Sequence, residues 1–193
     1  MLYLTVILVA NLLIALLNSL FAFSALRYFG ALGMTLLYTV AVIAVDGVFA
    51  FLIRRLPERW FRPENPSFAV SPRERRIYSA LGIKRWKDLI PELGVFTGFH
   101  KDRLESTSDT AYLCRFLLES NYGVLIHLAN AVSGFLILLL PFASRVCIAL
   151  PVACVNFVLS ILPVMILRYH TPVLLRLYRR SLRKDAKVKR SDP

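Results

Sequence analysis

The stretch "YFGALGMTLLYTVAVIAVDGVFAFLI", residues 28–53, decides the fold, because only one of its side chains, that of Asp46, is charged. About 20 residues of α-helix, at a rise of about 1.5 Å each, cross the roughly 30 Å hydrocarbon core of a bilayer. Three further segments are long enough to do the same and contain no charged residue, namely residues 2–26, 123–144 and 146–167. The sequence therefore predicts an all-α integral membrane protein with four transmembrane helices and a helical cytosolic cap between the second and third.

The 24 Lys and Arg residues are distributed unevenly along the chain. The loop 54–122 contains 13 of them and the tail from Arg168 contains 9, whereas the two remaining turns contain only Arg27 and Arg145. Basic side chains resist translocation, so we expect the large loop and both termini on the cytoplasmic side of the cell membrane. The expected parts are an N-terminal transmembrane hairpin (1–53), an amphipathic cytosolic cap (54–122), a C-terminal transmembrane hairpin (123–168) and a basic cytosolic tail (169–193).

A cleaved signal peptide is the competing interpretation of residues 1–25. The apolar run is longer than the core of a signal peptide, and no basic residue precedes it. We therefore expect this segment to be the first transmembrane helix.

The loop contains a short helix with clear start and stop signals, in "SPRERRIYSALG", residues 71–82. Ser71 suits the N-cap and Pro72 the first helical position. Glu74 completes a capping box, and Gly82 ends the helix. The apolar side chains on one face of this helix are those of Ile77, Tyr78 and Leu81. Together with three arginines elsewhere on its surface, they are typical of a helix that rests on lipid headgroups.

A second helix is expected to begin near Ser108 or Asp109 and to continue into the third span. At 100° per residue, one stripe of this helix carries polar residues and glycines within an arc of about 120°. Its members are Tyr112, Arg115, Glu119, Gly123, His127, Asn130 and Gly134. Glycines allow another helix or a ligand to come close, and an ionisable group within a membrane is a candidate functional site.

Several polar residues of different spans are expected at a similar depth in the cytosolic leaflet, counting about 1.5 Å per residue. They are Asn11, Asp46, His127, Ser160 and Arg168. Glu119 lies about 12 Å from His127 along an unbroken helix, so it cannot orient the imidazole directly. A partner on another helix is needed, for which we expect Asp46, while Asn130 or Asn156 offers a hydrogen bond instead.

Other classes of site find little support in the sequence. The three cysteines are too few and too scattered for a disulfide framework or a metal site, and no glycine-rich phosphate loop is present. The tail 176–190 carries eight basic residues and one acid. Because it adjoins a span and no recognition fold accompanies it, we expect it to bind anionic lipids and no nucleic acid.

Four stretches resemble one family in their order and spacing. They are "LPERWF" (56–61), "ERRIYSALGIKRWKDLIPELG" (74–94), "RFLLESNYGVLIHL" (115–128) and "NFVLSILPVMILRYHTPVLLRL" (156–177). Over roughly residues 50–180, the chain resembles the glycosyl-4,4'-diaponeurosporenoate acyltransferase family of the staphyloxanthin-type carotenoid pathway. It departs from the pattern of that family at Val124, Leu128, Leu167, His170 and Thr171.

The resemblance implies a small membrane enzyme that esterifies a sugar hydroxyl of a glycosylated carotenoid with a fatty acyl chain. The positions that it carries over are Glu119, His127, Asn156, Arg168, Tyr169, Trp86 and Lys87. We therefore expect an acyltransferase that moves a fatty acyl group to a hydroxyl of a lipid or glycolipid at the cytosolic leaflet. The alternative is a non-enzymatic membrane subunit or scaffold in which the polar stripe packs helices.

In the expected reaction, His127 is the general base, because a low-dielectric site keeps its imidazole neutral. The expected catalytic residues are His127, Glu119 and Asp46. The expected substrate-binding residues are Asn130, Asn156, Arg168, Tyr169, Trp86, Lys87, Lys84 and Arg85, of which Arg168, Tyr169 and Asn156 are candidate oxyanion donors. We expect no bound cofactor or metal, and an acyl thioester or acyl lipid as co-substrate. Its anionic head would bind to Lys84, Arg85, Lys87, His100, Lys101 and Arg103.

Overall fold

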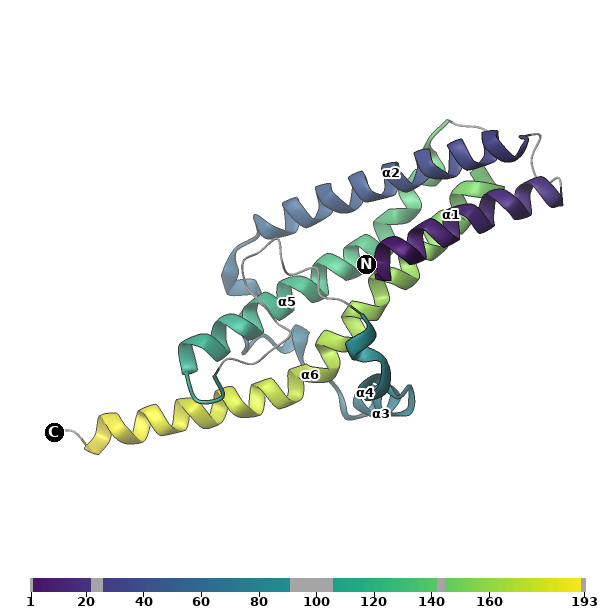
Figure 1. Ribbon diagram of the computed structural model, residues 1–193. Helices are drawn as coiled ribbons and strands as arrows, with labels where there is room; N and C mark the ends of the chain where they lie inside the picture. Colours follow the sequence, from purple (N-terminus) through teal and green to yellow (C-terminus); the bar gives the residue numbers. More distant parts are fainter. Residues whose placement is uncertain (1, 22–25, 91–105, 142–144, 192–193) are drawn as a thin grey trace. The chain divides into compact units, whose positions relative to one another are not determined.

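The computed structural model describes residues 2–21, 26–90, 106–141 and 145–191, and this part of the chain is helical, without a strand. Its four long helices are α1 (Leu2–Leu20), α2 (Tyr28–Arg54), α5 (Thr110–Ser133) and α6 (Leu150–Ser191) (Figure 1). The segments that are long and apolar enough to cross a membrane are Tyr3–Leu20, Tyr28–Arg54, Thr110–Leu139 and Val146–Lys187. The predicted all-α class and the prediction of four helices long and apolar enough to cross a membrane are therefore confirmed within the described residues.

The chain forms two compact units. The first unit consists of Met1–Arg55 and Ile126–Leu162, and the second consists of Leu56–Leu125 and Pro163–Pro193. Helices α5 and α6 contribute to both units. The predicted division into two hairpins, a cap and a tail, and the cytoplasmic orientation of the loop and termini, stay predictions.

The first unit has a core of small and branched apolar side chains. Helices α1 and α2 lie side by side (Figure 1), next to the 3₁₀ helix η5 (Gly134–Leu139), the π-helix η6 (Arg145–Ala149) and the beginning of α6. The buried members of this core are Ile14, Ala15, Ala31, Tyr38, Val42, Ile137, Ile148, Ala149, Val152 and Ala153. Four alanines among them let the helix backbones approach closely, as in packed transmembrane helices.

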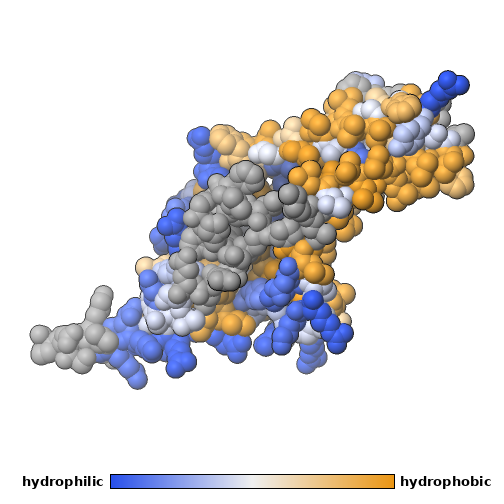
Figure 2. Space-filling view, viewed as in Figure 1, coloured by the Kyte–Doolittle hydropathy of each residue, from blue (hydrophilic) through white to orange (hydrophobic). Residues whose placement is uncertain are grey.

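The outer face of the first unit is hydrophobic. Large apolar side chains of α1 and α2 are exposed, such as Leu4 (72%) and Val40 (64%), and apolar residues cover these helices in Figure 2. A continuous apolar surface of this kind marks contact with lipid or another membrane helix. Polar residues within the helices bond to the preceding turn, for example Thr35 Oγ1 to the Ala31 carbonyl at 2.7 Å.

The second unit contains the short helices of the loop. They are η1 (Glu58–Trp60), η2 (Pro66–Phe68), α3 (Pro72–Ala80), α4 (Ile83–Trp86) and η3 (Lys87–Leu89). The first part of α5 packs against the last part of α6 through Leu113, Phe116, Leu117, Leu174 and Tyr178. The loop is therefore an ordered helical layer in its described part, as the sequence predicts.

The start and stop signals of α3 act as predicted. The backbone N–H of Glu74 donates to Ser71 Oγ at 3.1 Å, which is the N-cap half of the predicted capping box. Gly82 adopts a φ of 63°, in the left-handed region that suits glycine after a helix. At the start of α5, the Asp109 carboxylate accepts from the N–H groups of Ala111 and Tyr112, as an N-cap does.

The ends of the third and fourth spans differ from the sequence prediction. The third changes from α-helix to 3₁₀ helix at Gly134, ten residues before its expected end. The fourth continues as helix past residue 167 to Ser191, through Pro163 and Pro172. The extension has its own packing partners, because Thr110 of α5 hydrogen-bonds to Ser181 and Asp185 of α6.

Phe61 anchors the loop to α5 in the second unit. Its ring stacks on that of Tyr122 with a centroid separation of 3.7 Å, and its carbonyl accepts from Asn121 Nδ2 at 2.9 Å. Tyr122 Oη also donates to the Leu56 carbonyl at 2.9 Å. Two neighbouring side chains of α5 thus fix the chain that leaves α2.

Replacing Asn121 by Leu tests this anchor. The change leaves the buried carbonyl of Phe61 without its donor, so we expect the free energy of unfolding to fall by about 1–3 kcal/mol. Titration of the purified protein with SDS in mixed micelles measures this loss. In the control, Ser120→Ala removes a buried hydroxyl whose hydrogen bond among the described residues is to its own helix, at the Phe116 carbonyl, so both bonding partners stay within α5 and the expected loss is about 1 kcal/mol or less. Equal losses in the two variants would contradict the anchor.

Candidate functional site

A carboxamide joins three helices in the first unit. Asn156 of α6 donates from Nδ2 to Asp46 Oδ1 of α2 at 3.4 Å and to the Asn130 carbonyl of α5 at 3.2 Å. An ionisable group in a membrane helix needs such a partner, because an unpaired one costs several kcal/mol in hydrocarbon. The sequence analysis named all three residues, and the structure brings them together.

Gly134 makes room for this carboxamide. A Cβ atom at position 134 would lie 2.5 Å from Asn156 Nδ2 and 3.2 Å from Val42 Cγ2. Because Nδ2 is held by two hydrogen bonds, it cannot move away without weakening them. The expectation that a glycine of the polar stripe allows a close approach is confirmed at this position.

The same face of α5 holds two buried polar atoms that make no hydrogen bond to the described residues. They are Asn130 Oδ1 and Ser133 Oγ, in side chains that are 9% and 5% exposed. An unmade bond at a buried group costs about 1–3 kcal/mol. An acceptor and a hydroxyl are therefore still available beside the Asn156 carboxamide.

His127, the predicted base, is half-buried on α5 in the first unit, one turn before Asn130. Val124, one turn earlier, is buried at 2% exposure. His127 therefore lies on α5 between the turn that contains the apolar Val124 and the turn that contains the polar Asn130. Asp46 belongs to the same unit, so one predicted acid is in the same helix bundle as the predicted base.

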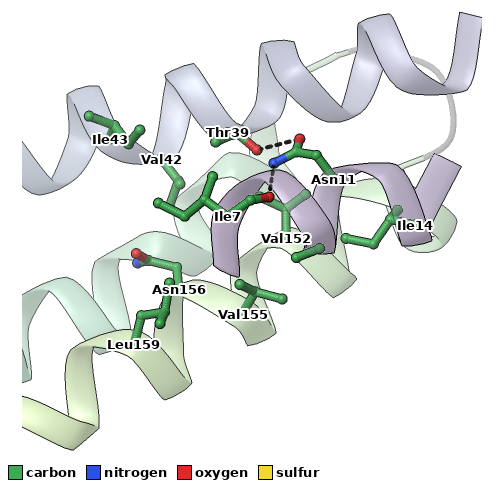
Figure 3. A pocket seen from close by; sticks show the side chains of 11 residues that line it. Ile7, Asn11, Ile14, Thr39, Val42, Ile43, Val152, Val155, Asn156 and Leu159 are labelled. Atoms are coloured by element: carbon green, nitrogen blue, oxygen red, sulfur yellow. Dashed lines mark hydrogen bonds between the residues drawn. The ribbon is translucent and has the colours of Figure 1, made fainter. Parts of the chain in front are cut away.

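A small cleft opens between α1, α2 and α6 in the first unit. Its lining residues are Ile7, Ala10, Asn11, Ile14, Thr39, Val42, Ile43, Val152, Val155, Asn156 and Leu159. Thr39 Oγ1 donates to Asn11 Oδ1 at 3.0 Å, and Asn11 Nδ2 donates to the Ile7 carbonyl at 2.7 Å (Figure 3). Apart from Asn11, Thr39 and Asn156, the lining of the cleft is aliphatic. Asn156 also donates a hydrogen bond to Asp46.

In the second unit, Arg168 is engaged by a carboxylate. Its guanidinium forms a bidentate ion pair with Glu74, with Nη2 2.8 Å from Oε2, and Nη2 also donates to the Ala69 carbonyl at 3.2 Å. Tyr78 Oη donates to the same carboxylate. The hydrogen bonds from Arg168 hold the pKa of Glu74 below its usual value, and burial raises the pKa of Tyr78 to about 12.

The sequence does not predict this ion pair, because its pattern assigns Glu74 only a capping role. Local spacing explains the cap but contains no signal for a partner 94 residues away. The pair ties α3 to α6 and occupies much of the guanidinium that was predicted to bind substrate.

The other predicted substrate-binding residues of the loop also belong to the second unit. Lys84 and Arg85 are exposed on α4, and Trp86 Nε1 donates to the Leu81 carbonyl at 3.0 Å. Lys87 forms an ion pair with Asp88 at 2.5 Å. His100, Lys101 and Arg103 lie outside the described residues.

Tyr169 follows Arg168 on α6, and its ring meets that of His170 nearly at right angles, with centroids 5.3 Å apart. Both side chains are half-buried. Glu119 is half-buried in the second unit, on the first part of α5. Among the described residues, no group of three or more His, Cys, Asp and Glu side chains could hold a metal ion.

The candidate residues thus form two groups. The first group belongs to the first unit, lies within helices that could cross a membrane, and consists of Asp46, His127, Asn130 and Asn156. Three of these residues are directly bonded, because Asn156 donates to Asp46 and to the Asn130 carbonyl. The second group is cationic and aromatic and consists of Lys84, Arg85, Trp86, Lys87, Arg168 and Tyr169.

Comparison with known families identifies the class as a membrane acyltransferase. Residues 57–180, about two thirds of the chain, match the family model of glycosyl-4,4'-diaponeurosporenoate acyltransferase (CrtO). The chain belongs to this family, as the resemblance in the sequence indicates. No curated protein and no solved structure matches the chain significantly.

Replacing Gly134 by Ala tests the close approach of Asn156. The added Cβ displaces a carboxamide held by two hydrogen bonds, so we expect the free energy of unfolding to fall by about 1–3 kcal/mol. Gly47→Ala on α2 is the matched control, since nothing lies within 4 Å of its added Cβ. Alanine is the better helix former by about 1 kcal/mol, so this control should be neutral or stabilising. Identical behaviour of the two variants in an SDS titration would refute the assignment.

The Glu74–Arg168 pair predicts a pH dependence of stability. Because the pKa of folded Glu74 is below its ordinary value of about 4.3, its ionised form stabilises the fold. This contribution is complete above that pH and is lost as the pH falls through the folded pKa. Wild type should therefore exceed Glu74→Gln in thermal stability at pH 6, and the difference should vanish in acid.

The control for this measurement is Asp88→Asn, which removes a carboxylate whose side chain is 79% exposed. Exposed ion pairs contribute little, so this variant should follow wild type across the pH range. A Glu74→Gln difference that stays constant down to pH 3 would show that the carboxylate charge is not what holds α3 to α6.

Proposed function

We propose that the protein transfers a fatty acyl group from an acyl thioester or acyl lipid to a hydroxyl group of a lipid or glycolipid acceptor. The match to an acyltransferase family over residues 57–180 carries this proposal. The polar group of the first unit supports it, because it supplies proton-accepting and hydrogen-bonding groups within helices that could cross a membrane. The acceptor is a glycosylated carotenoid or a similar glycolipid, and the reaction takes place at the cytosolic leaflet of the cell membrane.

His127 acts as the general base in this proposal. Its imidazole takes the proton from the acceptor hydroxyl while the hydroxyl oxygen forms a bond to the carbonyl carbon of the donor. The resulting oxyanion then collapses, the bond from carbon to the leaving sulfur or oxygen breaks, and the leaving group takes the proton from the imidazolium.

An amide group of the first unit binds the acceptor. Asn130 Oδ1, which is buried without a bond to the described residues, can accept a hydrogen bond from a hydroxyl group of the acceptor. Both donor hydrogens of Asn156 are used on Asp46 and the Asn130 carbonyl, so Asn156 fixes the position of this group and is not the free oxyanion donor that the sequence predicts. Asp46 holds the Asn156 carboxamide by accepting its hydrogen bond. Tyr169 remains a candidate oxyanion donor, and Glu119 remains a candidate acid on the same helix as the base.

Arg168 has a different role from the one its sequence position suggests. Its bidentate pair with Glu74 makes it a positioning residue for α3 rather than a free oxyanion donor. The helix α4 that follows α3 carries Lys84 and Arg85, which together with Lys87 bind the anionic head of the donor or of surrounding lipids. Trp86 lies beside them as an interfacial anchor.

The second candidate function is a non-enzymatic subunit or scaffold. The favouring observation is that Asn156 uses both N–H donors of its carboxamide for contacts between helices. Gly134 packs against the same carboxamide. Under this alternative, the polar stripe serves assembly, and loss of its members lowers stability or abundance rather than turnover.

Replacing His127 by Ala separates the two functions. An enzyme that uses this imidazole as its base should lose turnover by about 10²–10⁴-fold while keeping its abundance and thermal stability. Mass spectrometry of lipid and pigment extracts, from cells with and without the gene, first identifies the acylated product and then measures its loss. Leu128→Ala, on the neighbouring exposed position, is the control and should keep both activity and abundance. A His127→Ala protein that makes normal amounts of product would refute the role as base.

A further inference from the structure

We propose that the C-terminal part of α6, residues 173–187, is a docking helix for the headgroups of anionic phospholipids. This inference goes beyond acyl transfer and does not depend on it. The sequence predicts only that the basic tail binds such lipids, whereas the structure identifies the side of the helix that makes the contact. We call this side the basic face, and its members are Arg176, Arg179, Arg180, Arg183, Lys184 and Lys187.

Packing against α5 determines which side of this helix is exposed. Leu174, Tyr178 and Ser181 are buried, and the first two belong to a core shared with α5. At about 100° per residue, these buried side chains and the basic face point in nearly opposite directions from the helix axis. All members of the basic face are exposed, and hydrophilic side chains cover this part of α6 in Figure 2. The contact with α5 therefore leaves the basic face turned outward.

The acidic side chain of this segment is engaged on the other side of the helix. Asp185 is the one acidic residue among residues 168–187. Its Oδ2 accepts a hydrogen bond from Thr110 Oγ1 of α5 at 2.7 Å. Among the described residues, no carboxylate forms an ion pair with Arg179, Arg180, Arg183 or Lys184. The positive charges of these side chains are therefore not paired within the described part of the second unit.

The spacing of these charges is unfavourable for the helix itself. Like charges four residues apart lie on the same side, and each such pair destabilises a helix by about 0.2–0.5 kcal/mol. The helix dipole compensates only for cations in the last turn, and α6 ends at Ser191. The charge pattern therefore favours an anionic partner. The basic face contains four such pairs, which are Arg176 with Arg180, Arg179 with Arg183, Arg180 with Lys184, and Arg183 with Lys187.

Two features of the helix favour a lipid surface over a soluble acidic partner. The helix continues from an apolar segment that could cross a membrane, so lipid headgroups are close to it. Exposed apolar side chains also lie among the cations, with Val173 at 46% and Leu182 at 41% exposure. A helix that combines basic and exposed apolar side chains in this way binds at the headgroup layer of a membrane.

A second helix of the same unit has the same character. On α3, Ile77 is 57% exposed, and Arg73, one turn earlier, is exposed as well. The ion pair between Glu74 and Arg168 holds α3 against α6. Two connected helices with exposed cations and apolar side chains suit an extended membrane surface better than a small soluble anion.

Headgroup contact requires the C-terminal part of α6 to lie along the membrane surface. Pro163 and Pro172 both lie within α6, and proline is the usual position of a bend in a helix. The proposal therefore places the helix after Pro172 along the surface rather than away from it.

Photo-crosslinking tests the contact in the full-length protein. The protein is reconstituted in phosphatidylcholine nanodiscs with a trace of phosphatidylglycerol or phosphatidylcholine that carries a diazirine in its headgroup. Mass spectrometry of the digested protein then measures the label within residues 173–187. We expect at least fivefold more label from the phosphatidylglycerol probe, because each Lys or Arg near the surface contributes about 1 kcal/mol, which is about fivefold. Raising the ionic strength from about 0.1 M to about 1 M shortens the Debye length from about 10 Å to about 3 Å and should remove this preference.

Arg180→Gln combined with Arg183→Gln removes two members of the basic face. The matched control is Arg59→Gln combined with Arg62→Gln, which removes two exposed cations of the same unit at the same spacing. We expect the first variant to reduce labelling by phosphatidylglycerol at least fivefold, and the control to keep wild-type labelling. Both variants should keep wild-type thermal stability, because all four side chains are exposed.

Three outcomes would overturn the proposal, namely equal labelling by the two probes, a preference that survives about 1 M salt, and equal labelling of the two double variants. Background labelling of residues 173–187 by both probes overturns it as well. If purified acyl carrier protein then protects this segment from trypsin, the partner is a soluble acidic protein. None of these outcomes bears on the proposed acyl transfer, because the labelling does not require turnover.

Discussion

The carboxamide of Asn156 is the constraint on which the rest of the first unit depends. A carboxyl group at Asp46 is expensive in hydrocarbon unless another group bonds to it, and the partner it has comes from a different transmembrane helix. The second bond of Asn156, to the Asn130 carbonyl, brings in a third helix, and the approach of that helix requires a glycine at position 134. The Asn156 side chain therefore bonds to the carboxyl group of Asp46 and at the same time holds three helices of the first unit together.

The same coupling gives the site its chemical character. The Asn156 amide bonds to a carboxylate and also borders a small apolar cleft, so polar and apolar surfaces meet at this side chain. The second unit is held together by a different kind of contact. Its ion pair between Glu74 and Arg168 holds α3 on α6, and the short helix α4 with its basic residues Lys84 and Arg85 follows α3 directly.

Much of the fold follows from local signals in the sequence. Length and composition identify the membrane-crossing segments, since hydrocarbon tolerates little else. The caps at Ser71 and Asp109 and the glycine at position 82 are found in the structure because each acts through backbone groups a few residues away. Within the site, depth counting selected Asp46, and the glycine of the polar stripe at position 134 proved to be a point of close approach.

What the sequence does not predict are contacts between distant segments. The partner of Glu74 is 94 residues away, and nothing near either residue indicates the other. The continuation of α6 into the basic tail depends on bonds from Thr110 to Ser181 and Asp185, again between segments far apart in the chain. The cleft is likewise built from three helices and appears only when they pack.

The central claim is that Asp46 and Asn156 act as one unit in acyl transfer, and a double-mutant cycle on turnover tests it most directly. Asp46→Asn, Asn156→Leu and the double variant are compared with wild type for the rate of ester formation, with protein abundance measured in parallel. Two residues that act as a unit should show strong non-additivity, so that the double variant is little slower than the more impaired single variant. Additive losses, or full activity in both single variants, would contradict the account.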